Sequence, residues 1–114
     1  MLSPVMVLTI TVLFAAAPAA PPPWPESLDC AALTQAASEL HKDPVTGIPA
    51  EPEFDHAMFW SFAAMDAARL AGLSSAQAEA DQKTERARIK PLLAAGDPGA
   101  KARLAACVAQ VPPI

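Results

Sequence analysis

The residues of this chain whose types and spacing point most directly to chemistry are two cysteines, Cys30 and Cys107. An even number of cysteines in a short chain with an export signal predicts a structural disulfide. The chain has no Cys-x-x-Cys motif, and Cys30 follows the acidic Asp29, so neither a disulfide oxidoreductase nor an activated thiolate is predicted. We therefore predict a disulfide between Cys30 and Cys107.

His56 and its neighbours are the candidates for a metal site. His56 lies beside Asp55 and near Met58, and His41 with Asp43 could join it, because imidazole, carboxylate and thioether groups bind zinc or copper. The chain has only two histidines, however, and no histidine pair four residues apart. A structural role for His56 is favoured, and no metal or other cofactor is predicted. A small metal carrier stays the third functional alternative.

Acidic side chains gather at Glu51, Glu53 and Asp55, where a helix is expected to begin. Carboxylates at that end complement the positive pole of the helix dipole, so their position requires no acid–base chemistry. The sequence contains no phosphate-binding loop and no paired nucleophile and base. We predict no catalytic residues, and a protein that is not an enzyme.

The first 19 residues have the pattern of a secretory signal peptide. The apolar run from Val5 to Ala17 has the length of a signal-peptide core and is short for a membrane span. Ala17-Pro18-Ala19 supplies the small residues that a signal peptidase reads. We predict cleavage after Ala19 and a periplasmic or secreted location, with an uncleaved membrane anchor as the alternative. Residues 20–26 carry four prolines around Trp24, which predicts an extended segment.

Residues 27–114 have the size and composition of one small helical domain. From Ala20 onward the chain has 23 alanines and 21 large apolar residues, so its helices should form readily but bury little apolar area. The patterns predict an all-α bundle of four helices at about 27–41, 52–71, 75–95 with a kink at Pro91, and 98–111. A domain with so thin a core commonly needs a covalent staple.

The helix at 52–71 is expected to be the central one, because its large apolar residues project in nearly every direction. They make up one third of such residues in the mature chain: Phe54, Met58, Phe59, Trp60, Phe62, Met65 and Leu70. Cys30 and Cys107 fall on the expected buried faces of the first and last helices. The third helix should begin after the cap Ser74. It is polar almost all round, with a narrow stripe of small residues at Ala76, Ala80, Thr84 and Ala87.

Charge is unevenly divided along the chain, whose net charge is −4. From Glu26 to Asp66 eight side chains are acidic and one is basic, whereas from Ala67 to Ile114 four are acidic and seven are basic. The simplest explanation is that antiparallel helices of opposite charge pack side by side. The alternative is a surface with an acidic and a basic region that binds an oppositely charged partner. The overall acidity argues against nucleic-acid binding.

Together these features predict a small exported, non-enzymatic helical protein that acts by protein–protein interaction in the cell envelope, a chaperone-like or stress-related role being one version. The expected partner is another envelope protein, and the expected membrane contact is only through the signal segment before cleavage. The alternative is an inhibitor or immunity-type protein of a secreted enzyme, with the acidic stretch from Asp43 to Asp55 as the blocking element. Protonating the carboxylates below about pH 4 should loosen the helices.

Cleavage of the predicted signal peptide and formation of the predicted disulfide are tested together by intact-mass spectrometry of the native protein. We expect a chain that begins at Ala20 and is lighter than the reduced chain by two hydrogens, because the thiols have been oxidised to one disulfide. A mass that includes the first 19 residues, or one that matches two free thiols, would contradict this expectation.

Overall fold

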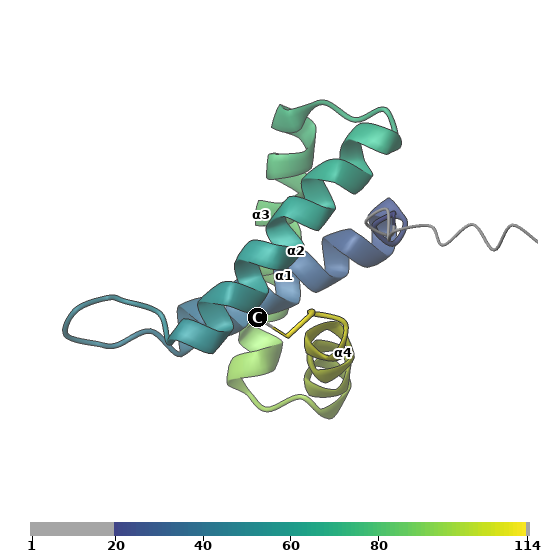
Figure 1. The fold of residues 1–114 in the computed structure, drawn as a ribbon. Coiled ribbons are helices and arrows are strands. Elements are labelled where there is room, and N and C mark those ends of the chain that lie inside the picture. The colour runs from purple at the N-terminus through teal and green to yellow at the C-terminus, as the bar shows by residue number, and fades with distance from the viewer. Residues whose placement is uncertain (1–19, 114) are drawn as a thin grey trace, which may run out of the picture.

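The computed structural model describes residues 20–113, so the predicted signal peptide at residues 1–19 lies outside the described residues. The chain forms four α-helices: α1 (Trp24–Leu40), α2 (Glu51–Leu70), α3 (Ser75–Ala94) and α4 (Pro98–Ala109). No strand occurs between residues 20 and 113 (Figure 1). The predicted all-α fold of four helices is confirmed, and each helix starts and ends within three residues of its predicted bounds.

The central helix is α1, and the prediction that the helix at 52–71 is central is wrong. α1 contacts each of the other three helices, whereas α2 and α3 contact each other much less. Its side chains Ala31, Ala32, Leu33 and Ala36 are fully buried. Small side chains let neighbouring helices approach α1 from several directions. The larger side chains of α2 present more apolar area than this alanine-rich surface can cover, so some of them remain exposed.

α1 begins three residues earlier than predicted, at Trp24, so the extended segment is limited to residues 20–23. Pro25 lies in the first turn, where its fixed φ suits a helix and its missing N–H is not needed. Ser27, expected near the helix start, is instead fully buried inside α1, and its hydroxyl donates to the carbonyl of Pro22 at 2.6 Å. This bond fixes the proline segment against the first turn.

Helix ends follow local signals in the sequence. The Ser74 hydroxyl accepts a hydrogen bond from the N–H of Gln77 at 3.1 Å, and the Asp97 carboxylate accepts one from the N–H of Ala100 at 2.9 Å. Gly72 follows α2 with φ of 80°, a conformation that glycine adopts without strain. Pro91 lies within α3, which continues to Ala94.

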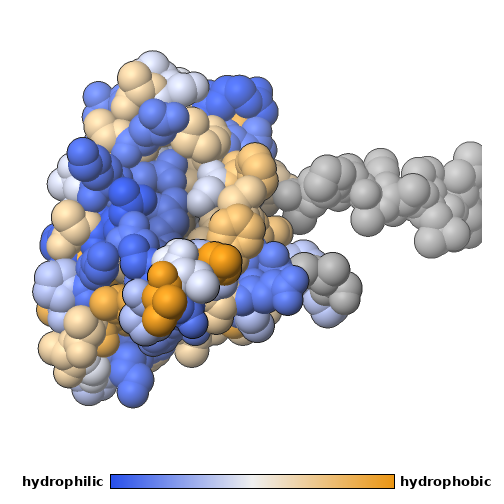
Figure 2. All heavy atoms as spheres, turned by 90° about the vertical axis from the view of Figure 1, so that its left-hand side faces the viewer, coloured by the Kyte–Doolittle hydropathy of each residue, from blue (hydrophilic) through white to orange (hydrophobic). Residues whose placement is uncertain are grey.

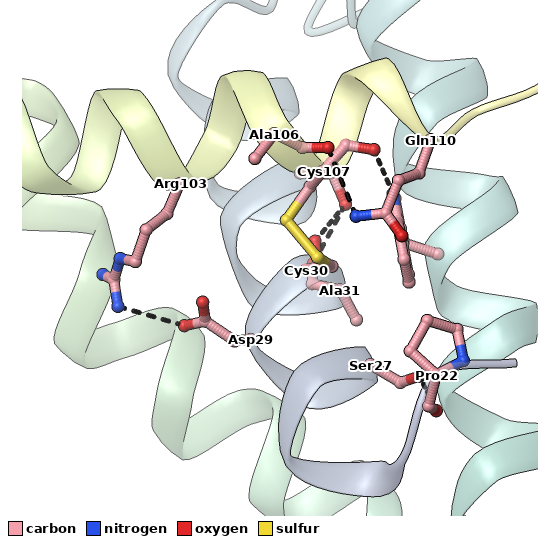
Figure 3. Close-up of a disulfide and its surroundings, with 11 residues drawn as sticks. Pro22, Ser27, Asp29, Cys30, Ala31, Arg103, Ala106, Cys107 and Gln110 are labelled. Carbon is pink, nitrogen blue, oxygen red and sulfur yellow. Dashed lines mark hydrogen bonds and ion pairs between the residues drawn. A yellow bond between two sulfur atoms is a disulfide. The ribbon is translucent and has the colours of Figure 1, made fainter.

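The predicted disulfide is present and joins the first helix to the last (Figure 3). Cys30 of α1 and Cys107 of α4 have Cα atoms 5.4 Å apart, and both side chains are buried. Beside the bond, the indole Nε1 of Trp60 donates to the carbonyl of Cys107 at 2.9 Å. Trp60 is only 1% exposed and is the largest side chain of the core, so α1, α2 and α4 meet at this point.

A partly buried polar cluster joins α1, α2 and α3. The amide nitrogen of Gln35 donates to the Ser61 hydroxyl and to the Gln82 carbonyl oxygen, both at 2.9 Å, and its oxygen accepts from Arg86 at 2.8 Å. Gln82 itself is buried, with Ala78 and Ile89 on the same face of α3. The predicted stripe of small residues, Ala76, Ala80, Thr84 and Ala87, is exposed. The face of α3 that packs against the bundle is the one that carries Gln82, a polar residue expected in solvent.

Acidic residues of the first half pair with basic residues of the second. The Glu39 carboxylate lies 2.8 Å from Lys90 Nζ and 3.2 Å from Arg86 Nε, and Asp29 lies 3.4 Å from Arg103. The division of charge along the sequence is therefore partly balanced by half-exposed ion pairs between helices, as the simplest interpretation predicted.

Removal of the disulfide should destabilise the domain strongly. A bond across 77 residues lowers the entropy of the unfolded chain by an amount worth about 4 to 5 kcal/mol in the chain-entropy model. A Cys30→Ala, Cys107→Ala variant should therefore unfold at a much lower urea concentration, and the amides of α4 should lose protection from hydrogen exchange first. An unchanged urea midpoint would contradict this role.

Acid should weaken the Glu39 cluster. The hydrogen bond from Lys90, followed by the nearby charge of Arg86, lowers the pKa of Glu39 below its ordinary value of 4.5. A carboxylate with a lowered folded-state pKa stabilises the fold above its unfolded-state pKa, and this contribution is lost as the pH falls through the folded value. In urea unfolding between about pH 6 and about pH 3, Glu39→Gln should show a shallower loss of stability than the native chain. If the free energy of unfolding falls equally with pH in Glu39→Gln and in the native chain, Glu39 is excluded as a cause of the loss of stability in acid.

Candidate functional site

The outward side of α2 exposes a row of large apolar side chains. Phe54, Met58 and Phe62 are all exposed and follow one another at intervals of four residues, so they are neighbours on one side of the helix. Phe62 is 69% exposed, although phenylalanine is among the residues most often buried. We call these three side chains the outer row.

A groove of about 700 Å³ lies beside the outer row. Phe62 belongs to both features, and most of the other lining side chains are apolar. They come from α2 and from the two ends of the described chain: Phe59, Ala63, Pro21, Pro22 and Pro112. A groove of this size lined by aromatic and apolar side chains, with Asp66 as its one acidic lining residue, has the properties of a binding surface.

The loop at 41–50 projects from the bundle between α1 and α2 (Figure 1). Asp43 holds its shape: its carboxylate accepts from the backbone N–H of Val45 and of Thr46, at 2.7 and 2.9 Å. These bonds, with that of Thr46 contributing most, lower the pKa of Asp43. The Asp43 N–H also donates to the carbonyl of Ile48 at 2.8 Å, which closes the loop.

The ordered loop presents apolar side chains to solvent. Val45 is 92% exposed and Ile48 is also largely exposed. Figure 2 views the molecule from the side on which this loop projects and shows strongly hydrophobic atoms in the foreground against a mostly hydrophilic face. An exposed valine held on a pre-ordered turn can enter a pocket of another protein at little cost in entropy.

A smaller pocket of about 180 Å³ lies where the end of α1, the start of α2 and α4 meet. His41, Glu53 and His56 line it together with Thr34, Ala37, Leu104 and Val108. The Glu53 Oε1 atom lies 2.8 Å from His41 Nδ1. The structure therefore brings the two histidines to one pocket, with Glu53 as the acidic group that the metal hypothesis did not include.

The other residues of the metal hypothesis lie elsewhere. Asp43 binds backbone N–H groups of the loop, and Met58 belongs to the outer row. Between residues 20 and 113, no three His, Cys, Asp or Glu side chains are arranged closely enough to hold a metal ion. Glu51, Glu53 and Asp55 occupy the first turns of α2, as predicted from the helix dipole.

A disulfide is consistent with an oxidising compartment outside the cytosol. Of the helices in the described part of the chain, none combines the length and apolarity that a membrane span needs. Comparisons of the chain with protein-family models, with curated proteins and with solved structures found no match.

Proposed function

We propose that this is an exported, non-enzymatic protein of the cell envelope that binds another protein through the outer row of α2 and the adjoining groove. The observation that carries the proposal is the exposure of Phe54, Met58 and Phe62 in a chain with a thin, alanine-rich core. Large apolar side chains stabilise a domain most when buried, so their placement outside the core favours a second molecule that covers them.

The charges around the outer row favour a partner with basic residues. Glu51 and Asp55 flank Phe54 and form no ion pair among the described residues. Asp66, near the other end of the row, pairs only with Arg69 of its own helix. Two copies of this surface facing each other would bring like charges together, so we propose a partner segment with apolar residues flanked by lysine or arginine.

The ordered loop supports the second candidate, an inhibitor or immunity-type protein of a secreted enzyme. Residues 44–46 form a turn, and the Asp43–Ile48 hydrogen bond closes it. Such a turn presents the Val45 side chain as a projection rather than an extended strand, so it suits an enzyme whose cleft accepts a single apolar side chain. It does not suit a cleft that binds an extended peptide along its backbone.

The proposal is tested by photo-crosslinking in intact cells, with p-benzoylphenylalanine in place of Phe62 in one strain, of Val45 in another and of Lys83 in a third. Lys83 is exposed on α3, lines neither the groove nor the loop, and serves as the control. We expect one adduct from position 62, and mass spectrometry should find its crosslink in a partner segment with apolar and basic residues. One enzyme captured from position 45 alone would favour the inhibitor.

With the partner purified, Phe62→Ser should weaken binding about tenfold or more, because burying a phenylalanine side chain is worth about 1.5 to 3 kcal/mol. The same change should alter the free energy of unfolding by less than about 0.5 kcal/mol, because Phe62 is largely exposed in the free protein. Binding that is unchanged in Phe62→Ser, or equal crosslinking from positions 62 and 83, would exclude the outer row as the interface.

A further inference from the structure

The loop at 41–50 is the longest connection between helices, and its hydrogen bonds are separate from those of the bundle. Residues 41–48 are all exposed, and each hydrogen bond of residues 43–48 has both partners within the loop. The connections at 71–74 and 95–97 are shorter, and they are bonded to the helices, as when the N–H of Leu73 donates to the carbonyl of Ala68 at 2.9 Å. The 41–50 loop can therefore open while the four helices stay packed.

The same loop lies inside the covalent ring that the disulfide closes. This ring consists of the main chain from Cys30 to Cys107 and the S–S bond. In the chain-entropy model the disulfide stabilises the fold because the ring restricts the unfolded chain. Hydrolysis of one peptide bond within the ring converts it to a linear path, so the restriction is lost although the S–S bond is intact and α1 remains attached through Cys30.

Val45 identifies the class of endoprotease that the loop suits. Its side chain is small, branched and 92% exposed, and it matches the small specificity pocket of an elastase-type serine endoprotease. Ile48 is the other exposed aliphatic residue of the loop, but it precedes Pro49, whose ring crowds the peptide bond after Ile48. The bond between Val45 and Thr46 is therefore the favoured point of cleavage.

We propose that the loop is a modification site, at which an endoprotease of this class hydrolyses the Val45–Thr46 bond and thereby cancels the stabilisation that the disulfide provides. Water is the co-reactant: the C–N bond breaks, Val45 gains a carboxylate and Thr46 gains an ammonium group. The cut acts without a reductant, which suits the oxidising compartment proposed above. The inference does not depend on the outer row.

Asp43 protects this bond while the loop is closed. An endoprotease binds its substrate as an extended segment, whereas residues 43–48 form a closed turn. The Asp43 carboxylate accepts hydrogen bonds from the N–H groups of Val45 and Thr46, the residues on the two sides of the bond to be cut. When opening and closing are fast, the rate of cleavage follows the open fraction of the loop.

The test uses pancreatic elastase and the oxidised protein purified after export. We expect a first product that is heavier than the intact protein by one water, stays a single species without reductant and separates after reduction into fragments 20–45 and 46–114. Once elastase is inhibited, the cut protein should have a urea midpoint at least about 1 M below that of the intact protein, and within about 0.5 M of that of the Cys30→Ala, Cys107→Ala variant.

Two variants form a matched pair for the protecting turn. Asp43→Ala should be cut at least about fivefold faster, because it lacks both hydrogen bonds to the turn, whereas Lys42→Ala loses an exposed neighbouring side chain and should change the rate less than about twofold. Free peptides of residues 38–50 with the native and the Asp43→Ala sequences should be cut at equal rates, which excludes a preference of elastase for alanine at position 43.

Val45→Glu removes the side chain that the elastase pocket accepts. Because Val45 is almost fully exposed, this variant should keep the urea midpoint of the native protein, and it should resist the first cut.

The inference is overturned if the first cut falls outside the loop, if cutting leaves the urea midpoint unchanged, or if the Asp43→Ala and native proteins are cut at equal rates. Tight binding of elastase without cleavage would also overturn it and would favour the inhibitor. None of the cleavage results alters crosslinking from position 62, so the outer row is tested separately.

Discussion

The bond between Cys30 and Cys107 is the constraint on which the rest of this fold depends. α4 is short and buries only Ala100 and Cys107 fully, so it has little apolar area of its own to hold it in place. The disulfide fixes α4 against α1, and this position supplies the carbonyl to which the Trp60 indole donates. One covalent link therefore sets the geometry of a three-helix junction, and that junction contains the largest buried side chain of the domain.

The distribution of side-chain sizes explains why the protein has both a thin core and an apolar surface. The buried positions of α1 are mostly small residues, namely alanine, serine, threonine and cysteine, which brings neighbouring helices close and limits the space between them for large side chains. Trp60 is buried, and Phe59 and Trp24 pack partly against the same core, while the aromatic residues Phe54 and Phe62 remain outside. The composition that limits the core is thus also the reason that α2 can offer a binding face.

Features that depend on neighbours in sequence could be predicted, and those that depend on distant neighbours could not. The four helices, the caps Ser74 and Asp97 and the disulfide follow from local signals and from the cysteine count. The central position of α1 could not be foreseen from the sequence. The large apolar side chains of α2 suggested that α2 was central, but the sequence does not show whether such side chains pack in the core or lie on the surface. The approach of Glu53 to His41 also escaped prediction, since it arises only where two helix ends meet. Likewise, nothing in the sequence marks Gln82 as buried, because its hydrogen-bonding partners come from other helices.

The sequence separation of the two cysteines has a consequence for how the chain matures. In the export proposed above, the chain would enter the oxidising compartment from its N-terminus, so Cys30 would arrive first, and Cys107 lies 77 residues later. Until then the early thiol stays reduced or forms a mixed disulfide with another molecule, and Trp60 lacks its backbone acceptor. The disulfide can therefore form only after the last helix has been made, and a chain truncated before α4 would keep an unpaired thiol at Cys30.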